Sequence, residues 1–159
     1  MKKIFLIVAF FATAFVQQSF ARDNKQPAQL SQLLHSYYDI KNALVAGDAT
    51  TAASKAEEFV KIVNGISSNK ISEEARNGLL KEATQIAKTK EISHQREHFA
   101  TFSTILFSLA KSVKLTSDPI YEAYCPMKKV YWLSSEKDIK NPYYGKAMLT
   151  CGSVKETLQ

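Results

Sequence analysis

Residues 99–113, FATFSTILFSLAKSV, decide the fold class of this chain. Apolar residues recur in this segment at alternating steps of three and four positions, and they are Phe99, Phe102, Leu106, Leu109 and Val113. This spacing is typical of a helix that buries one face. We therefore predict an amphipathic helix here, and the rest of the chain is interpreted around it.

Three earlier segments show the same helical periodicity. The first covers residues 30–44 and ends at Gly47. The second opens near Asp48, a favourable N-cap residue, and stops at Gly65, while the third follows Ser72. Short connections between helices favour antiparallel neighbours. The sequence thus predicts an all-α fold, an up-down four-helix bundle.

The last part of the chain, residues 116–159, differs from the helical part. It is rich in tyrosine, is punctuated by proline and glycine, and shows no long periodicity. We interpret it as an irregular, aromatic-rich C-terminal cap on the bundle. Structured segments of this kind often carry function. Residues 28–159 are accordingly expected to form a single domain that includes this cap.

The N-terminus is typical of a cleavable secretory signal peptide, residues 1–21. Lys2 and Lys3 precede an apolar run over residues 4–16, and small residues, Ser19 and Ala21, stand before the expected cleavage point. The run is shorter than the roughly 20 apolar residues of a spanning helix. We expect an exported chain that spans no membrane after cleavage. The polar residues 22–27 predict a short disordered lead-in.

Charge and motifs exclude several classes of function. The formal net charge of +6 is modest and spread along the chain, so it gives no reason to expect a nucleic-acid partner. No paired-carboxylate, nucleophile-elbow or phosphate-loop pattern occurs in the sequence. We therefore expect a protein that is not an enzyme.

Two short sulfur-containing motifs lie in the predicted cap. Cys125 and Met127 belong to the first, and Met148 and Cys151 belong to the second. Thiolate and thioether are soft ligands, which suit Cu(I) above all. An alternative stays open, because two cysteines of an exported protein commonly form a disulfide. A Cys125–Cys151 disulfide would exclude a thiolate site.

A histidine pair lies on the fourth predicted helix. His94 and His98 are four residues apart, which places both rings on one face, one turn apart. Two histidines at this spacing can bind one metal ion, and imidazole suits copper or zinc. His98 is also in step with Phe102, so it borders the buried face of the helix.

Several motifs in fixed order resemble the family called domain of unknown function 3347. They extend over residues 30–154 and include Gln95-Arg96-Glu97-His98-Phe99, Tyr124-Cys125-Pro126-Met127, Trp132-Leu133-Ser134, Asn141-Pro142-Tyr143-Tyr144-Gly145 and Met148-Leu149-Thr150-Cys151-Gly152. That family occurs as stand-alone exported proteins and as a C-terminal domain of periplasmic adaptor subunits of heavy-metal efflux pumps. The resemblance implies a periplasmic role tied to copper or related metals, with an efflux adaptor or other periplasmic protein as a partner.

These observations give one leading hypothesis and one rival. The leading hypothesis is a periplasmic metal-binding protein, for copper, that acts as a carrier or an accessory to efflux. Its expected ligands are Cys125, Cys151, His98 and His94, with Met127 and Met148 as weaker ligands or as a shield, and with Trp132, Tyr143 and Tyr144 as a dry surrounding. The rival is a helical interaction module that binds no metal and is stapled by the Cys125–Cys151 disulfide.

Overall fold

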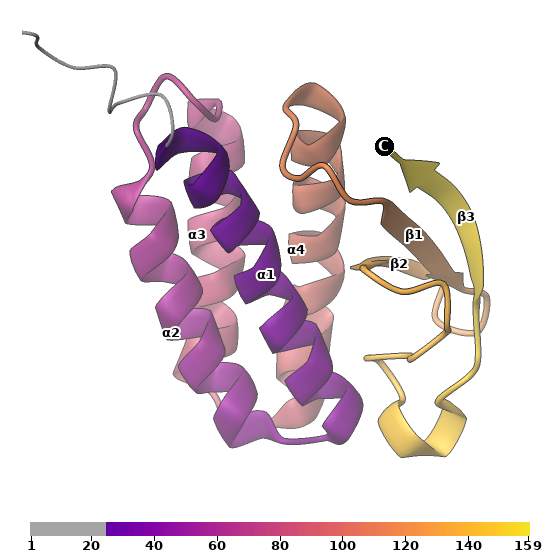
Figure 1. Cartoon of the computed structure of the whole chain (residues 1–159). Helices are drawn as coiled ribbons and strands as arrows, with labels where there is room; N and C mark the ends of the chain where they lie inside the picture. The colour runs from indigo at the N-terminus through magenta and orange to yellow at the C-terminus, as the bar shows by residue number, and fades with distance from the viewer. Residues whose placement is uncertain (1–24) are drawn as a thin grey trace, which may run out of the picture.

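The computed structural model describes residues 25–159, which contain four helices. These are α1 (Lys25–Ala46), α2 (Ala49–Gly65), α3 (Glu73–Lys88) and α4 (Ile92–Ser112). They run alternately up and down, as predicted (Figure 1). None of the helices within residues 25–159 has the length and apolar character that crossing a membrane requires. The predicted signal peptide, residues 1–21, lies outside the described residues.

Local side-chain caps explain where two of the helices begin. Asp48 Oδ1 accepts a hydrogen bond of 2.9 Å from the backbone N–H of Thr51 at the start of α2. Ser72 Oγ accepts one of 3.2 Å at the start of α3. The first helix, α1, begins at Lys25, within the range predicted as the lead-in. Pro27 lies in the first turn of α1, where a helix needs no N–H donor.

The C-terminal part forms an antiparallel sheet, so the prediction of an all-α fold with an irregular cap is wrong. The sheet contains β1 (Ile120–Cys125), β2 (Val130–Ser134) and β3 (Ser153–Leu158) in the order β2-β1-β3. A short 3-10 helix, η1 (Gly145–Met148), precedes β3. Pro126 and Pro142 lie in the connections and not in the strands, which is why the segment looked irregular. The fold is therefore mixed α/β.

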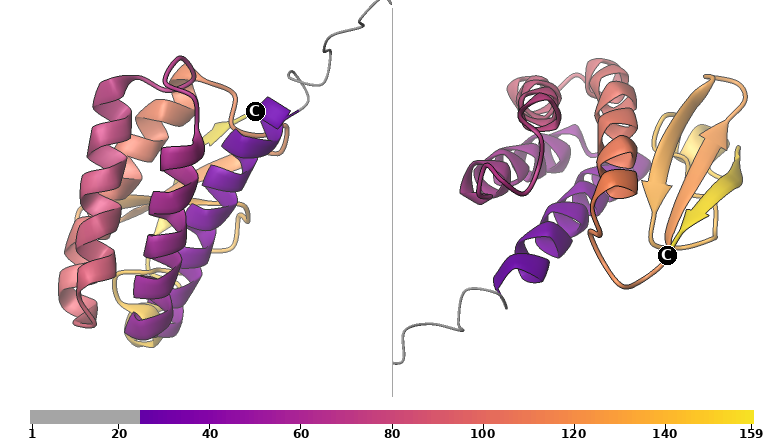
Figure 2. Two further views of the ribbon diagram at one scale, coloured as in Figure 1. Left: turned by 90° about the vertical axis from the view of Figure 1, so that its left-hand side faces the viewer. Right: turned by 90° about the horizontal axis from the view of Figure 1, so that it is seen from above.

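The sheet lies beside α4, with β2 on the side of the bundle (Figure 2). Cys125 of β1 pairs with Val130 across a tight turn. On the other edge of β1, Tyr124 pairs with Ser153 at the start of β3. The end of β1 that carries Cys125 therefore lies next to the chain that enters β3.

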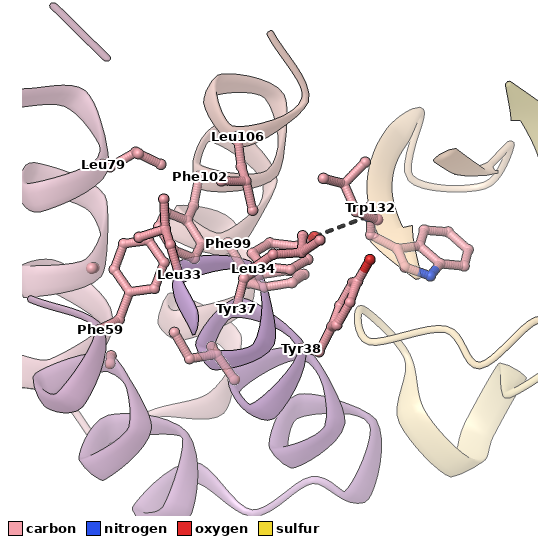
Figure 3. Close-up of a cluster of buried hydrophobic side chains, with 14 of the residues drawn as sticks. Leu33, Leu34, Tyr37, Tyr38, Phe59, Leu79, Phe99, Phe102, Leu106 and Trp132 are labelled. Atoms are coloured by element: carbon pink, nitrogen blue, oxygen red, sulfur yellow. Dashed lines mark hydrogen bonds between the residues drawn. The ribbon is translucent and has the colours of Figure 1, made fainter. Parts of the chain in front are cut away.

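Tyr37 of α1 connects the sheet to the bundle. Its ring stacks on Phe99 with centroids 5.1 Å apart, and its hydroxyl forms a hydrogen bond of 2.7 Å with Ser103. The same hydroxyl accepts a hydrogen bond of 3.0 Å from the backbone N–H of Leu133 in β2, the contact drawn in Figure 3. Because all of these groups are buried, Tyr37 fixes β2 against α1 and α4.

Candidate metal site

The structure brings the two cysteines together. Cys125 ends β1, and Cys151 lies between η1 and β3. Their sulfur atoms are 3.9 Å apart, and both are free thiols. Cys125 is fully buried, whereas Cys151 is partly exposed. The pair therefore forms a dithiol that solvent reaches from the Cys151 side.

The turn after Cys125 surrounds its sulfur with donors. The backbone N–H of Lys129 donates to the carbonyl of Cys125 at 2.8 Å, which closes the turn between β1 and β2. Lys129 adopts a positive φ of 58° to do so. Within this turn, the backbone N–H groups of Met127 and Lys128 favour the Cys125 thiolate and lower the pKa of this thiol. The turn formed by the Cys-Pro-Met sequence thus favours the thiolate form of Cys125.

Asn141 connects the two cysteines from inside the protein. It is fully buried, and its Nδ2 donates to the carbonyl of Cys151 at 2.7 Å. Its side chain also lowers the pKa of the Cys125 thiol. Its Oδ1 accepts from the backbone N–H of Tyr143 at 2.8 Å, which holds the amide in this orientation. Asn141 therefore positions both halves of the dithiol.

The two thiols have opposite pKa shifts. Burial raises the pKa of Cys125, but the hydrogen bonds from Lys128, Asn141, Cys151 and Met127 outweigh this effect and lower the pKa below its usual value. Burial raises the pKa of Cys151, and the neighbouring Cys125 raises it further. Cys125 is therefore the thiol of the pair that loses its proton first.

Gly152 allows the chain to place Cys151 beside Cys125. Its φ is +148°, and a Cβ at this position would lie 2.7 Å from Cη2 of Trp132 and 2.9 Å from the carbonyl oxygen of Tyr124. Trp132 is only 1% exposed and packs edge-on against Tyr143. The chain at Gly152 thus passes directly over the buried ring of Trp132.

Both methionines of the predicted ligand set lie on the surface. Met127 is 63% exposed and Met148 is 40% exposed, in contrast to the buried Cys125. Met127 lies in the turn after Cys125, and the carbonyl of Met148 accepts a hydrogen bond of 3.1 Å from Cys151. Both side chains are therefore on the surface, and each is close in sequence to one of the two cysteines.

The histidines form a separate pair. His98 Nδ1 lies 2.6 Å from Oε2 of Glu82 on α3, and the Nε2 atoms of His94 and His98 are 3.2 Å apart. In the part of the chain that the structure describes, no three His, Cys, Asp or Glu residues converge on one metal position. His98 therefore shares no metal position with the two cysteines. The predicted ligand set is divided into a thiol pair and an imidazole pair.

Glu82, Asn141 and Gly152 were not predicted as site residues. Glu82 carried a signal, because it is in step with Leu79 and Ile86 on the buried face of α3. A carboxylate in that register needs a buried partner. Gly152 and Asn141 carried no local signal, since their roles depend on contacts made only in the folded cap.

The comparisons with known proteins identify a family but no function. A family model described as "Protein of unknown function (DUF3347)" matches residues 33–118. The match covers α2–α4 and most of α1, and it ends before Cys125, whereas the resemblance was expected to reach residue 154. No curated protein and no solved structure matches the chain. Because the family model covers more than half of the sequence, the chain belongs to the DUF3347 family of proteins of unknown function.

Proposed function

We propose that this protein is an exported copper-binding protein that holds Cu(I) at the thiol pair of Cys125 and Cys151. It acts as a carrier or an accessory in periplasmic heavy-metal efflux. One observation carries the proposal: the sulfurs of two free thiols lie 3.9 Å apart. The lowered pKa of Cys125 supports it, because it favours the thiolate. The site is thus arranged for a soft cation before any cation arrives.

The sulfur–sulfur distance suits two bonds to one ion. Metal–sulfur bonds of about 2.3 Å would meet at an angle of about 115° across this gap of 3.9 Å. Zinc in a structural site requires four protein ligands, and the described residues offer no third His, Cys, Asp or Glu here. Cu(I) accepts fewer and softer ligands, so the dithiol favours copper.

In the proposed site, the two methionines provide a route by which Cu(I) enters and leaves. Met127 and Met148 are the exposed sulfurs, and Cys125 is the buried one. An incoming Cu(I) ion would meet a thioether first and then transfer to the stronger thiolate. The reverse transfer would present the ion to a periplasmic partner, such as an efflux-pump adaptor. The signal-peptide pattern of residues 1–21 supports a location where such partners occur.

The rival function is an interaction module that a Cys125–Cys151 disulfide stabilises. The short distance between the two sulfurs supports this alternative as well. A disulfide requires sulfurs about 2.05 Å apart. Bond formation would therefore need Cys125 and Cys151 to approach by about 2 Å, and it would stabilise the fold by about 3–4 kcal/mol. No thiolate would then remain for copper.

A Cu(I) titration of the reduced protein under anaerobic conditions, in competition with bathocuproine disulfonate, tests the proposal. We expect one tightly bound Cu(I) per chain, lost in Cys125→Ser and in Cys151→Ser. Leu149→Ala is the matched control, because Leu149 is also exposed beside the site but carries no sulfur. Alkylation and mass measurement of the exported protein would show whether Cys125 and Cys151 form the disulfide that the rival function requires. Fully oxidised cysteines, together with no Cu(I) binding after reduction, would overturn the copper function.

A further inference from the structure

The histidine pair is built around a buried carboxylate. Glu82 on α3 is 6% exposed, and its Oε2 lies 2.6 Å from Nδ1 of His98 on α4. Its other oxygen is 3.8 Å from the ammonium of Lys81, which is largely in solvent. The short contact to His98 therefore dominates the environment of the carboxylate. It joins α3 to α4 and fixes the orientation of the His98 ring.

This contact determines what the other nitrogen of His98 can do. When Nδ1–H donates to Glu82, neutral His98 carries a lone pair on Nε2. That Nε2 atom lies 3.2 Å from Nε2 of His94, one turn earlier on the same helix. Metal–nitrogen bonds of about 2.0–2.1 Å would meet at about 100° across this distance, close to the tetrahedral angle. The two rings are thus already placed to share one ion.

We propose that His94 and His98 form a second metal site, for a borderline divalent cation such as Zn(II) or Cu(II), with Glu82 as the positioning residue. A carboxylate that accepts from the far nitrogen of a ligating histidine raises the basicity of that ligand and fixes its tautomer. His94 is exposed, so water reaches the ion and fills its remaining positions. The site is therefore an open one, with two protein ligands.

The second site differs from the dithiol in chemistry and in place. Imidazole suits Zn(II) and Cu(II), whereas thiolate and thioether suit Cu(I). The partner of His98 is on α3, while both cysteines lie in the sheet region and contact Asn141. This inference does not depend on the proposed copper function, and each of the two sites can exist without the other.

The test uses Zn(II), which does not oxidise the thiols, and follows the imidazole NMR resonances of the whole protein. We expect the resonances of His94 and His98 to shift together, while those of His35 stay unchanged. His94→Ala should abolish this binding. His35→Ala, an exposed histidine on α1, is the matched control and should bind as the wild type does. The Cys151→Ser variant should also bind normally, which separates this site from the dithiol.

Glu82→Gln tests the positioning role. Glutamine keeps an acceptor for Nδ1–H of His98 but removes the charge, so we expect Zn(II) affinity to fall by about 10–100-fold with the fold retained. His94→Ala decides the question even if Glu82→Gln destabilises the protein, because His94 is on the surface. The inference is overturned if adding His94→Ala to the Cys151→Ser variant leaves its Zn(II) affinity unchanged. Loss of all Zn(II) binding in Cys151→Ser would overturn it equally.

Discussion

Replacing Gly152 by alanine is the sharpest perturbation of the dithiol that leaves both cysteines intact. The new Cβ would lie 2.7 Å from Trp132 Cη2 and 2.9 Å from the Tyr124 carbonyl oxygen. Neither neighbour can give way easily, because Trp132 is buried and Tyr124 contributes backbone of β1. Overpacking of this kind costs about 1–3 kcal/mol, and a positive φ in a residue with a side chain costs about 1–3 kcal/mol more. We expect Gly152→Ala to lower the free energy of unfolding by about 2–6 kcal/mol.

Urea unfolding and the Cu(I) competition titration measure the two consequences. Gly65→Ala is the control, since a Cβ there meets nothing within 4 Å, and we expect it to be neutral or slightly stabilising. The displaced Cys151 should also weaken Cu(I) binding, by about tenfold for each 1.4 kcal/mol needed to bring the sulfurs back together. If Gly152→Ala is as stable as Gly65→Ala and binds Cu(I) as tightly as the wild type, then Gly152 does not position Cys151.

Two further predictions concern the bundle and its pH dependence. Tyr37→Phe leaves the buried N–H of Leu133 without its acceptor and should cost about 1–3 kcal/mol in thermal or urea unfolding. Tyr38→Phe, on the same helix, is the control, because no residue within 25–159 forms a hydrogen bond with its hydroxyl. Equal losses in both variants would refute the role of Tyr37. Burial lowers the pKa of Lys41 to about 8, so the folded protein holds fewer protons than the unfolded chain between about pH 8 and pH 10.5. The free energy of unfolding should therefore rise with pH across this window by up to about 3 kcal/mol. Urea unfolding of Lys41→Met should show no such rise. The same rise in the variant would refute the assignment of this pH dependence to Lys41.

The helices were predictable because their signals are local. The apolar steps of residues 99–113 became the buried face of α4, with Phe99, Phe102 and Leu106 fully inside. Asp48 and Ser72 are N-caps, because the side-chain oxygen of each accepts a hydrogen bond from the free backbone N–H three residues later. These contacts need no knowledge of the rest of the fold.

The sheet and the division of the metal ligands were not predicted, for a different reason. The strand β2, with Val130, Tyr131 and Trp132, does have strand-favouring residues. Its partner β1 pairs with both β2 and the distant β3, however, and such pairing is not local. The distance between His98 and the cysteines likewise depends on which face of α4 the sheet covers. Helical spacing alone places two histidines together but cannot say what lies beside them.

X-ray absorption at the copper edge of the Cu(I)-loaded protein tests the central claim most directly, because it reports which atoms bind the metal. The dithiol account predicts a shell of sulfur only, with at least two sulfur ligands supplied by Cys125 and Cys151, and no change in that shell in His94→Ala. A shell that contains imidazole nitrogen, or a reduced protein that retains no copper for the measurement, would contradict it.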